Sequence, residues 1–213
     1  MNIGTCVDRD KSIYTSGSLR WCCVGGEEFN WLLQYGHFDK AAEKAATYQT
    51  FLKKHEKDKE RWNTYFITAY YRLAYLFFGQ ENYRTALVFI NKIRNEFKYS
   101  VHPSVFLHTK ILNILLHYEL KNYRHLVYLI NATQTFLKKR QDSPPFLSNL
   151  LYDLKEAAQL EQILTQKKWQ ILANSLDLPQ NKVTLRFFDY KSWCESKVLG
   201  QSFDQKCNSN TIK

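Results

Sequence analysis

The hexapeptide Gln-Thr-Phe-Leu-Lys-Lys occurs twice in this chain, at residues 49–54 and again at residues 134–139. The two copies begin 85 residues apart, and the same separation relates Phe38 to Tyr123, with Tyr83 between them. Internal repeats are typical of stacked architectures, in which each unit buries its apolar face against its neighbour. The repeat therefore predicts a solenoid and favours a binding function.

Each of these three aromatic residues begins the same pattern of side chains. Residues at offsets 0, 3, 7, 10 and 14 lie on one face of a helix, and all but Thr133 are apolar or aromatic. The positions are Phe38, Ala41, Ala45, Tyr48 and Leu52; Tyr83, Ala86, Ile90, Ile93 and Phe97; and Tyr123, Leu126, Ile130, Thr133 and Leu137. We call them the repeat stripe, and they predict three amphipathic helices.

Partner helices are expected before each stripe, at residues 27–35, 62–78 and 104–120. Residues 146–176 are expected to form one long helix or two, and a last helix is expected at 182–199. The predicted fold class is all-α, specifically an alpha-alpha superhelix in which antiparallel helix pairs stack as a solenoid.

The domain organisation follows from where this pattern begins and ends. Residues 27–199 form the predicted repeat domain, and residues 1–26 are expected to be irregular or a remnant of a preceding repeat, with one short helix near residues 19–24. Residues 200–213 are expected to be a polar tail that frays. Gly36 and Gly79 suit the left-handed conformation that commonly ends a helix.

Composition narrows the functional classes. The net charge is +10, but Lys and Arg are distributed along the whole chain. The five cysteines are odd in number and form no C-x-x-C pair, which argues against a zinc site or a dense disulfide framework. No apolar run reaches 18 residues and no secretory signal is visible, so we expect a cytoplasmic protein without a membrane partner.

Catalytic signatures are absent from the sequence. It contains no H-E-x-x-H, G-x-S-x-G, phosphate-loop or dinucleotide motif. His108 and His117 lie nine residues apart on one predicted helix, which places them on opposite faces and prevents joint chelation. We therefore expect no catalytic residue, no cofactor and no metal.

The second unit resembles the tetratricopeptide repeat, a 34-residue pair of antiparallel helices. Its motif positions are matched by Tyr70, Leu73, Ala74, Phe77, Tyr83, Ala86 and Ile90. The third unit departs from the motif, with Lys110, Asn113 and His117 at first-helix positions and Leu126 at the small contact position. The spacings of 45 and 40 residues also exceed 34, which implies longer helices or connections.

A narrower resemblance covers residues 27–199. The segments 117–123, 135–140 and 188–197 are similar to a group of uncharacterised bacterial helical-repeat proteins. Members of that group are generally longer at the amino end, so the resemblance implies that this chain is a carboxy-terminal portion. No enzymatic activity comes with the resemblance.

In tetratricopeptide arrays the first helices line a concave groove that binds a peptide or a partner helix. The resemblance places ten residues of this chain in such a groove: Thr68, Tyr71, Arg72, Tyr75, Phe78, His108, Ile111, Leu115, Tyr118 and Glu119. Tyr and Arg are favoured interface anchors. The alternative is that an adjoining helix of the same chain, such as 146–176, fills the groove.

The predicted function is a non-catalytic protein-protein interaction module, a scaffold or adaptor whose partner is a protein or peptide of unknown identity. The alternative is a basic helical-repeat protein that binds nucleic acid through a Lys/Arg surface. The nucleic-acid hypothesis is favoured if eight basic residues form one continuous surface. They are Arg61, Arg72, Arg84, Arg94, Lys98, Arg124, Lys138 and Arg140.

Overall fold

The repeat stripe faces inward in three equivalent helices, α2 (Phe38–Lys54), α4 (Tyr83–Glu96) and α6 (Tyr123–Lys138). The stripe residues are buried, except that Tyr83, Phe97 and Tyr123 are half-buried. In α2 the buried residues are the five stripe positions and no others. The periodic pattern therefore predicted both the helices and the faces they bury.

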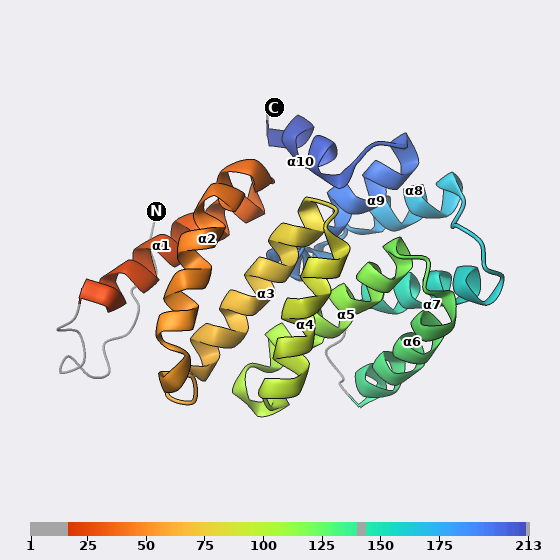
Figure 1. Cartoon of the computed structure of the whole chain (residues 1–213). Coiled ribbons are helices and arrows are strands. Elements are labelled where there is room, and N and C mark those ends of the chain that lie inside the picture. The colour runs from red at the N-terminus through yellow and green to blue at the C-terminus, as the bar shows by residue number, and fades with distance from the viewer. Residues whose placement is uncertain (1–16, 140–143, 212–213) are drawn as a thin grey trace.

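The computed structural model describes residues 17–139 and 144–211, which are all-helical and contain no strand. Three partner helices precede α2, α4 and α6, namely α1 (Gly17–Gln34), α3 (Asn63–Gly79) and α5 (Pro103–Glu119). The hairpins lie side by side along the molecule (Figure 1). Short 3-10 turns, η1 (Glu56–Asp58) and η2 (Tyr99–Val101), lengthen the connections between hairpins.

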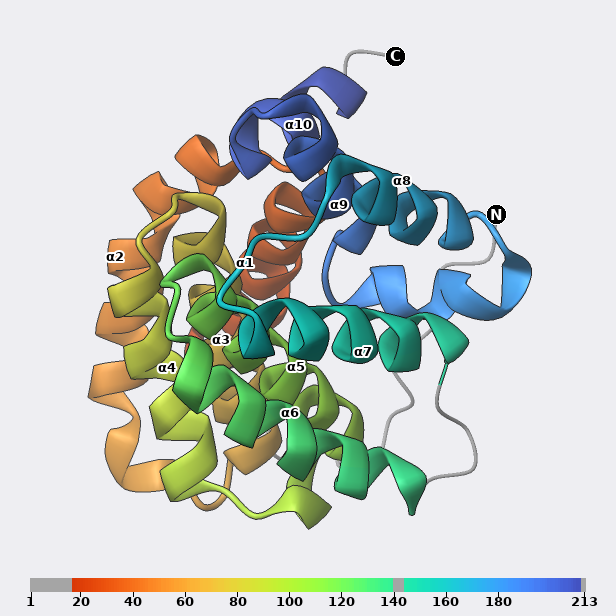
Figure 2. The ribbon, with the colours of Figure 1, turned by 90° about the vertical axis from the view of Figure 1, so that its right-hand side faces the viewer.

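The remaining helices turn back over this array. They are α7 (Pro145–Gln159), α8 (Gln166–Ser175), η3 (Pro179–Arg186), α9 (Tyr190–Leu199) and α10 (Phe203–Thr211). Viewed from the side, α8 to α10 lie across one face of the molecule, whereas α2, α4 and α6 lie on the other (Figure 2). The inner helices α3 and α5 are therefore covered on both sides.

The hairpins close through the same pair of backbone hydrogen bonds. In the first turn Gly36 N donates to Leu33 O at 3.2 Å and His37 N to Leu32 O at 2.8 Å. Residues 77–82, 117–122 and 157–162 repeat this pattern, and the residue with positive φ in each turn is Gly36, Glu81, Lys121 or Glu161. This pair of bonds is the Schellman ending of a helix.

Gly79 does not adopt the left-handed conformation that the sequence suggested, because Glu81 holds that position in its turn. Glycine is required at 79 for another reason. A Cβ atom there would lie 2.4 Å from two ring carbons of Phe38. The α3 backbone therefore packs directly against the first residue of the α2 stripe.

Two other expectations, one near each end of the chain, are corrected. Residues 17–26 are helical and form the first part of α1, while residues 1–16 lie outside the described part. The helix expected at 182–199 begins only at Tyr190, because Asp189 caps it by accepting a hydrogen bond from Ser192 N at 3.0 Å. The segment 146–176 forms two helices, α7 and α8, which is one of the two arrangements expected for it.

The polar tail is also more ordered than expected. Residues 203–211 form α10, in which Phe203 and Cys207 are buried. Phe203 lies 5.6 Å from the ring of Phe38 and 5.8 Å from that of Phe78, and a Cβ at Gly36 would meet Cys207 Cβ at 2.3 Å. The carboxy-terminal helix thus packs on the first hairpin, and two apolar residues within a polar segment are sufficient to hold it there.

Replacing Gly79 by Ala tests the close approach of α3 and α2. Ala is preferred over Gly in a helix by up to about 1 kcal/mol, so an uncrowded site would be stabilised. Because the new Cβ overlaps the Phe38 ring, we expect Gly79→Ala to lower the free energy of unfolding by about 1–3 kcal/mol, measured by urea denaturation. Phe38→Leu should partly relieve this loss in the double variant, whereas purely additive effects would contradict the contact.

Candidate functional site

The inner face of α3 and α5 brings the ten predicted groove residues together. Ile111 and Leu115 are fully buried, and Tyr71, Tyr75 and Tyr118 are each about 5% exposed. Only Thr68, Arg72 and Glu119 of the ten are half-buried. The residues share one face as expected, but most of that face does not contact solvent.

A segment of the chain itself, residues 187–190, covers this face. Tyr71 Oη donates to the carbonyl of Phe187 at 3.1 Å, and Asp189 N donates to Tyr75 Oη at 3.3 Å. The ring of Phe187 stacks on His108 at 4.0 Å, and Phe188 packs edge-on against Phe78 at 5.1 Å. We call residues 187–190 the inner strap. Its backbone polar groups are satisfied by the tyrosines of α3.

Helix α9 secures the strap at the other end of the groove. Trp193 is fully buried, and its Nε1 donates to Glu119 Oε1 at 2.7 Å. Lys197 Nζ lies 2.6 Å from the same carboxylate, whose side chain is 11% exposed. Hydrogen bonds to a charged group are stronger than neutral ones, so Glu119 holds α9 in a fixed register on α5.

The groove is therefore filled intramolecularly, which is the alternative that the sequence left open. The occupant differs from the one suggested, because residues 187–203 contribute most of the cover. From the 146–176 segment, Trp169 contacts Tyr118 at 5.8 Å and Leu164 N donates to Tyr118 Oη at 3.4 Å. The partner-binding role of the ten residues stays a prediction.

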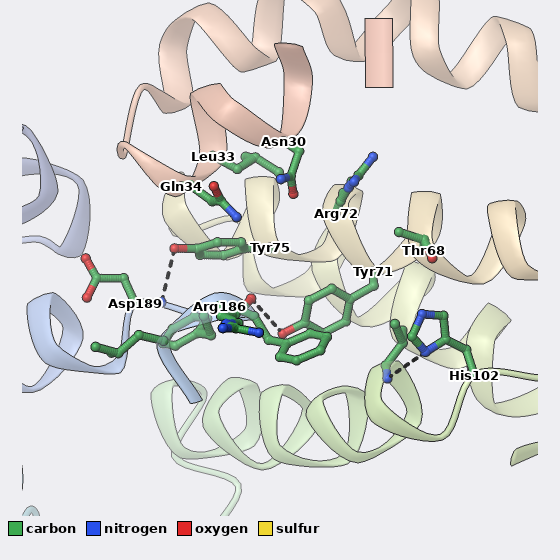
Figure 3. Close-up of a pocket in the computed structure, with 14 residues that line it drawn as sticks. Asn30, Leu33, Gln34, Thr68, Tyr71, Arg72, Tyr75, His102, Arg186 and Asp189 are labelled. Carbon is green, nitrogen blue, oxygen red and sulfur yellow. Dashed lines mark hydrogen bonds between the residues drawn. The ribbon is translucent and has the colours of Figure 1, made fainter. Parts of the chain in front are cut away.

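A pocket of about 210 Å³ lies beside the strap, between α1, α3 and the start of α5, and strap residues form part of its wall (Figure 3). Tyr71, Tyr75 and Thr68 line it from α3, and Leu33 lines it from α1. Its polar groups come from Asn30, Gln34, Arg72, His102, Arg186 and Asp189. Two arginines and one aspartate make its charge positive.

Two of these polar groups are oriented by local contacts. Arg72 Nη1 donates to the carbonyl of Gly26 at 3.0 Å, which holds the guanidinium beside α1. His102 caps α5, and its Nδ1 accepts from Val105 N at 3.4 Å. A neutral ring with Nδ1 as acceptor carries its proton on Nε2, so His102 is a donor toward its surroundings.

Burial is the main influence on the titratable groups around the strap. Burial raises the pKa of Tyr71 and of Tyr75 well above the ordinary value, so both remain protonated hydrogen-bonding groups. Burial likewise raises the pKa of the Cys194 and Cys207 thiols, which disfavours the nucleophilic thiolate. Among the described residues no three His, Cys, Asp or Glu side chains gather in a way that could hold a metal ion.

Sequence reasoning missed the α1 and strap residues of this pocket. The strap belongs to no repeat unit, and its sequence Phe187-Phe188-Asp189-Tyr190 was interpreted as helical. One available signal was Asp189 followed three residues later by Ser192, a spacing that suits a helix start. Asn30 and Gln34 gave no signal, because they are polar positions, half-buried and exposed respectively, of a helix whose neighbours were not known.

Comparison of the chain with family models, with curated proteins and with solved structures finds no match. Helices long and apolar enough to cross a membrane do not occur in the described ranges. Interpretation of the site therefore depends on its own geometry.

Replacing Trp193 by Phe tests whether the Glu119 contact holds the strap. The change removes the indole donor from a carboxylate that is nearly buried and leaves unfilled volume, so we expect the free energy of unfolding to fall by about 2–4 kcal/mol. Amide hydrogen exchange should also accelerate in residues 187–199. The matched change Trp31→Phe, at a side chain that is 50% exposed, should cost less than about 1 kcal/mol. Equal losses in the two variants would contradict this role for Glu119.

Proposed function

We propose that this chain is a non-catalytic protein-interaction module with a tetratricopeptide-like superhelical arrangement. Three observations support the arrangement: the hairpins share one turn geometry, the inner helices α1, α3 and α5 are neighbours, and consecutive elements pack in order. The motif positions Leu73, Ala74 and Ala86 are fully buried where the resemblance places the contact between paired helices. The resemblance to uncharacterised bacterial helical-repeat proteins belongs to the same proposal.

The pocket beside the strap is the observation that carries the binding role. Its volume of about 210 Å³ is below the roughly 300–1,000 Å³ of typical small-molecule sites. A single side chain of a partner segment fits this size better than a cofactor does. The tyrosine walls offer apolar contact, and Arg72 and His102 offer donors to a carbonyl or carboxylate of that segment.

The absence of catalysis is part of this proposal and is supported by how the polar groups are used. Tyr71 and Tyr75 hydrogen-bond the strap, and His102 Nδ1 caps α5. General acid-base chemistry needs convergent groups with matched pKa values. We also propose a cytoplasmic location, which the free thiol of Cys194 supports because reduced cysteines suit that compartment.

Site-specific photo-crosslinking in the full chain tests the binding role. A photoreactive amino acid at position 68, on the pocket wall, should give a discrete protein adduct in the native cell, identified by mass spectrometry. The same residue at position 43, on the exposed face of α2, serves as the control. Adding Arg72→Glu, which reverses the charge at the pocket, should reduce the position-68 adduct at least fivefold. Identical adducts from positions 68 and 43, or no response to Arg72→Glu, would argue against the pocket.

A further inference from the structure

Positive charge is concentrated in one part of the array. Residues 83–139, which span α4 to α6, contain nine Lys and Arg and two Glu, a net charge of +7 out of +10 for the whole chain. Seven of these nine cations are exposed, and Lys92 and Lys110 are half-buried. The cations themselves are spread evenly along the sequence. The net positive charge is concentrated in this segment because it contains few acidic residues.

Neither glutamate of this segment neutralises its cations. Glu96 pairs with Lys59 of the preceding connection at 2.9 Å, and Glu119 is directed into the groove, where Lys197 and Trp193 bind it. Among the residues that the structure describes, none of the nine cations forms an ion pair. In the described part of the chain the carboxylate of Glu161 lines a pocket with Lys121, Arg124 and His125 but forms no ion pair with them. A carboxylate, phosphate or other anion from outside the chain would therefore meet unpaired cations.

One cation of α4, Arg94, lies close to Lys110 and His117 of α5, on the side of α5 opposite the strap. Lys110 and His117 lie seven residues apart on one face of α5, and the His117 ring is 4.5 Å from that of His125 on α6. Arg94 on α4 is close enough to lower the pKa of both Lys110 and His117, after the larger effect of burial. Mutual repulsion within this group would be relieved by a bound anion.

Aromatic rings are interleaved with these charges. Tyr128 is 67% exposed and stacks on His125 at 6.1 Å. Phe136 is half-buried, with Lys110 Nζ 5.3 Å from its ring centre and Tyr99 packed edge-on at 5.3 Å. Cations that follow a phosphate backbone, together with rings on which bases can stack, are the combination used to bind single strands.

We propose that the α4–α6 face, formed by Arg84, Arg94, Lys98, Lys110, Arg124 and Tyr128, binds single-stranded nucleic acid. The lysines and arginines contact phosphates, and the exposed Tyr128 ring stacks on a base. An acidic peptide could satisfy the charges, whereas a single strand also supplies a base beside each phosphate that can stack on Tyr128. This surface lies on the outer side of the array, so the inference does not depend on the function proposed for the pocket (Figures 1 and 2).

Fluorescence anisotropy with the full chain and a labelled 20-nucleotide oligouridine tests the proposal. We expect measurable binding at 50 mM salt that weakens steeply with added salt, because phosphate contacts release counterions. The variant Arg94→Gln/Lys110→Gln/Arg124→Gln should lose at least tenfold in affinity. The slope of log K against log salt should fall by about 2, since each single-strand contact contributes about 0.7.

The matched control is Lys40→Gln/Lys53→Gln/Lys167→Gln, which removes three exposed positive charges from α2 and α8. It should retain affinity within threefold of the unmodified chain. Tyr128→Ala should weaken binding at least fivefold through lost stacking. Equal losses in the two triple variants, or no loss in the first, would overturn the assignment of this surface.

Two further measurements identify the ligand and the place. A 20-residue polyglutamate should bind at least tenfold more weakly than the oligouridine, and equal or tighter binding would replace nucleic acid by an acidic protein.

His117 has a pKa lowered to about 4 by burial, His125 and Arg94. A nearby phosphate favours its protonated form, so NMR titration should show this pKa rising when oligouridine is bound. A His117 pKa that stays the same would place binding elsewhere and overturn the proposal.

Discussion

The inner helices α3 and α5 are apolar on nearly every side, and the rest of the molecule is arranged to keep them from water. Eleven of the 17 residues of α3 and twelve of the 17 in α5 are buried. A helix that is hydrophobic all round must be covered all round. The paired helices α4 and α6 cover one side through the repeat stripe, and the strap with α9 and α10 covers the other. A solenoid with an open concave face would expose Ile111, Leu115 and Phe78.

The strap brings backbone N–H and C=O groups into the groove, and a fully apolar groove could not form hydrogen bonds with them. The strap is not helical, so its backbone groups need partners from the groove wall. Tyr71 and Tyr75 supply them through their hydroxyl groups while their rings remain in the core. A tyrosine hydroxyl group can donate to a backbone carbonyl or accept from a backbone N–H, so it suits the neutral backbone of the strap.

The sequence predicted what depends on local periodicity. The stripe in α2, α4 and α6 follows from 3.6 residues per turn, and α3 and α5 follow from long apolar runs between turns. The strap could not be predicted in this way, because Tyr71 and Phe187 meet across 116 residues and nothing periodic connects them. The left-handed residues Glu81 and Lys121 were obscured because the turn, rather than the residue type, sets their conformation. The pocket depends on the strap, so it was beyond prediction for the same reason.

The fold also determines where charge lies on the surface, and the amino-acid composition does not reveal that distribution. Glu119 stabilises the inner side by binding Trp193 and Lys197, and Glu96 is held by Lys59. Each pairing removes a negative charge from the neighbourhood of Arg94, Lys110 and Arg124. The outer face of α4 to α6 is consequently more basic than the segment would be if its acids faced outward. The Glu119 contacts that close the groove therefore also keep one negative charge away from the opposite surface.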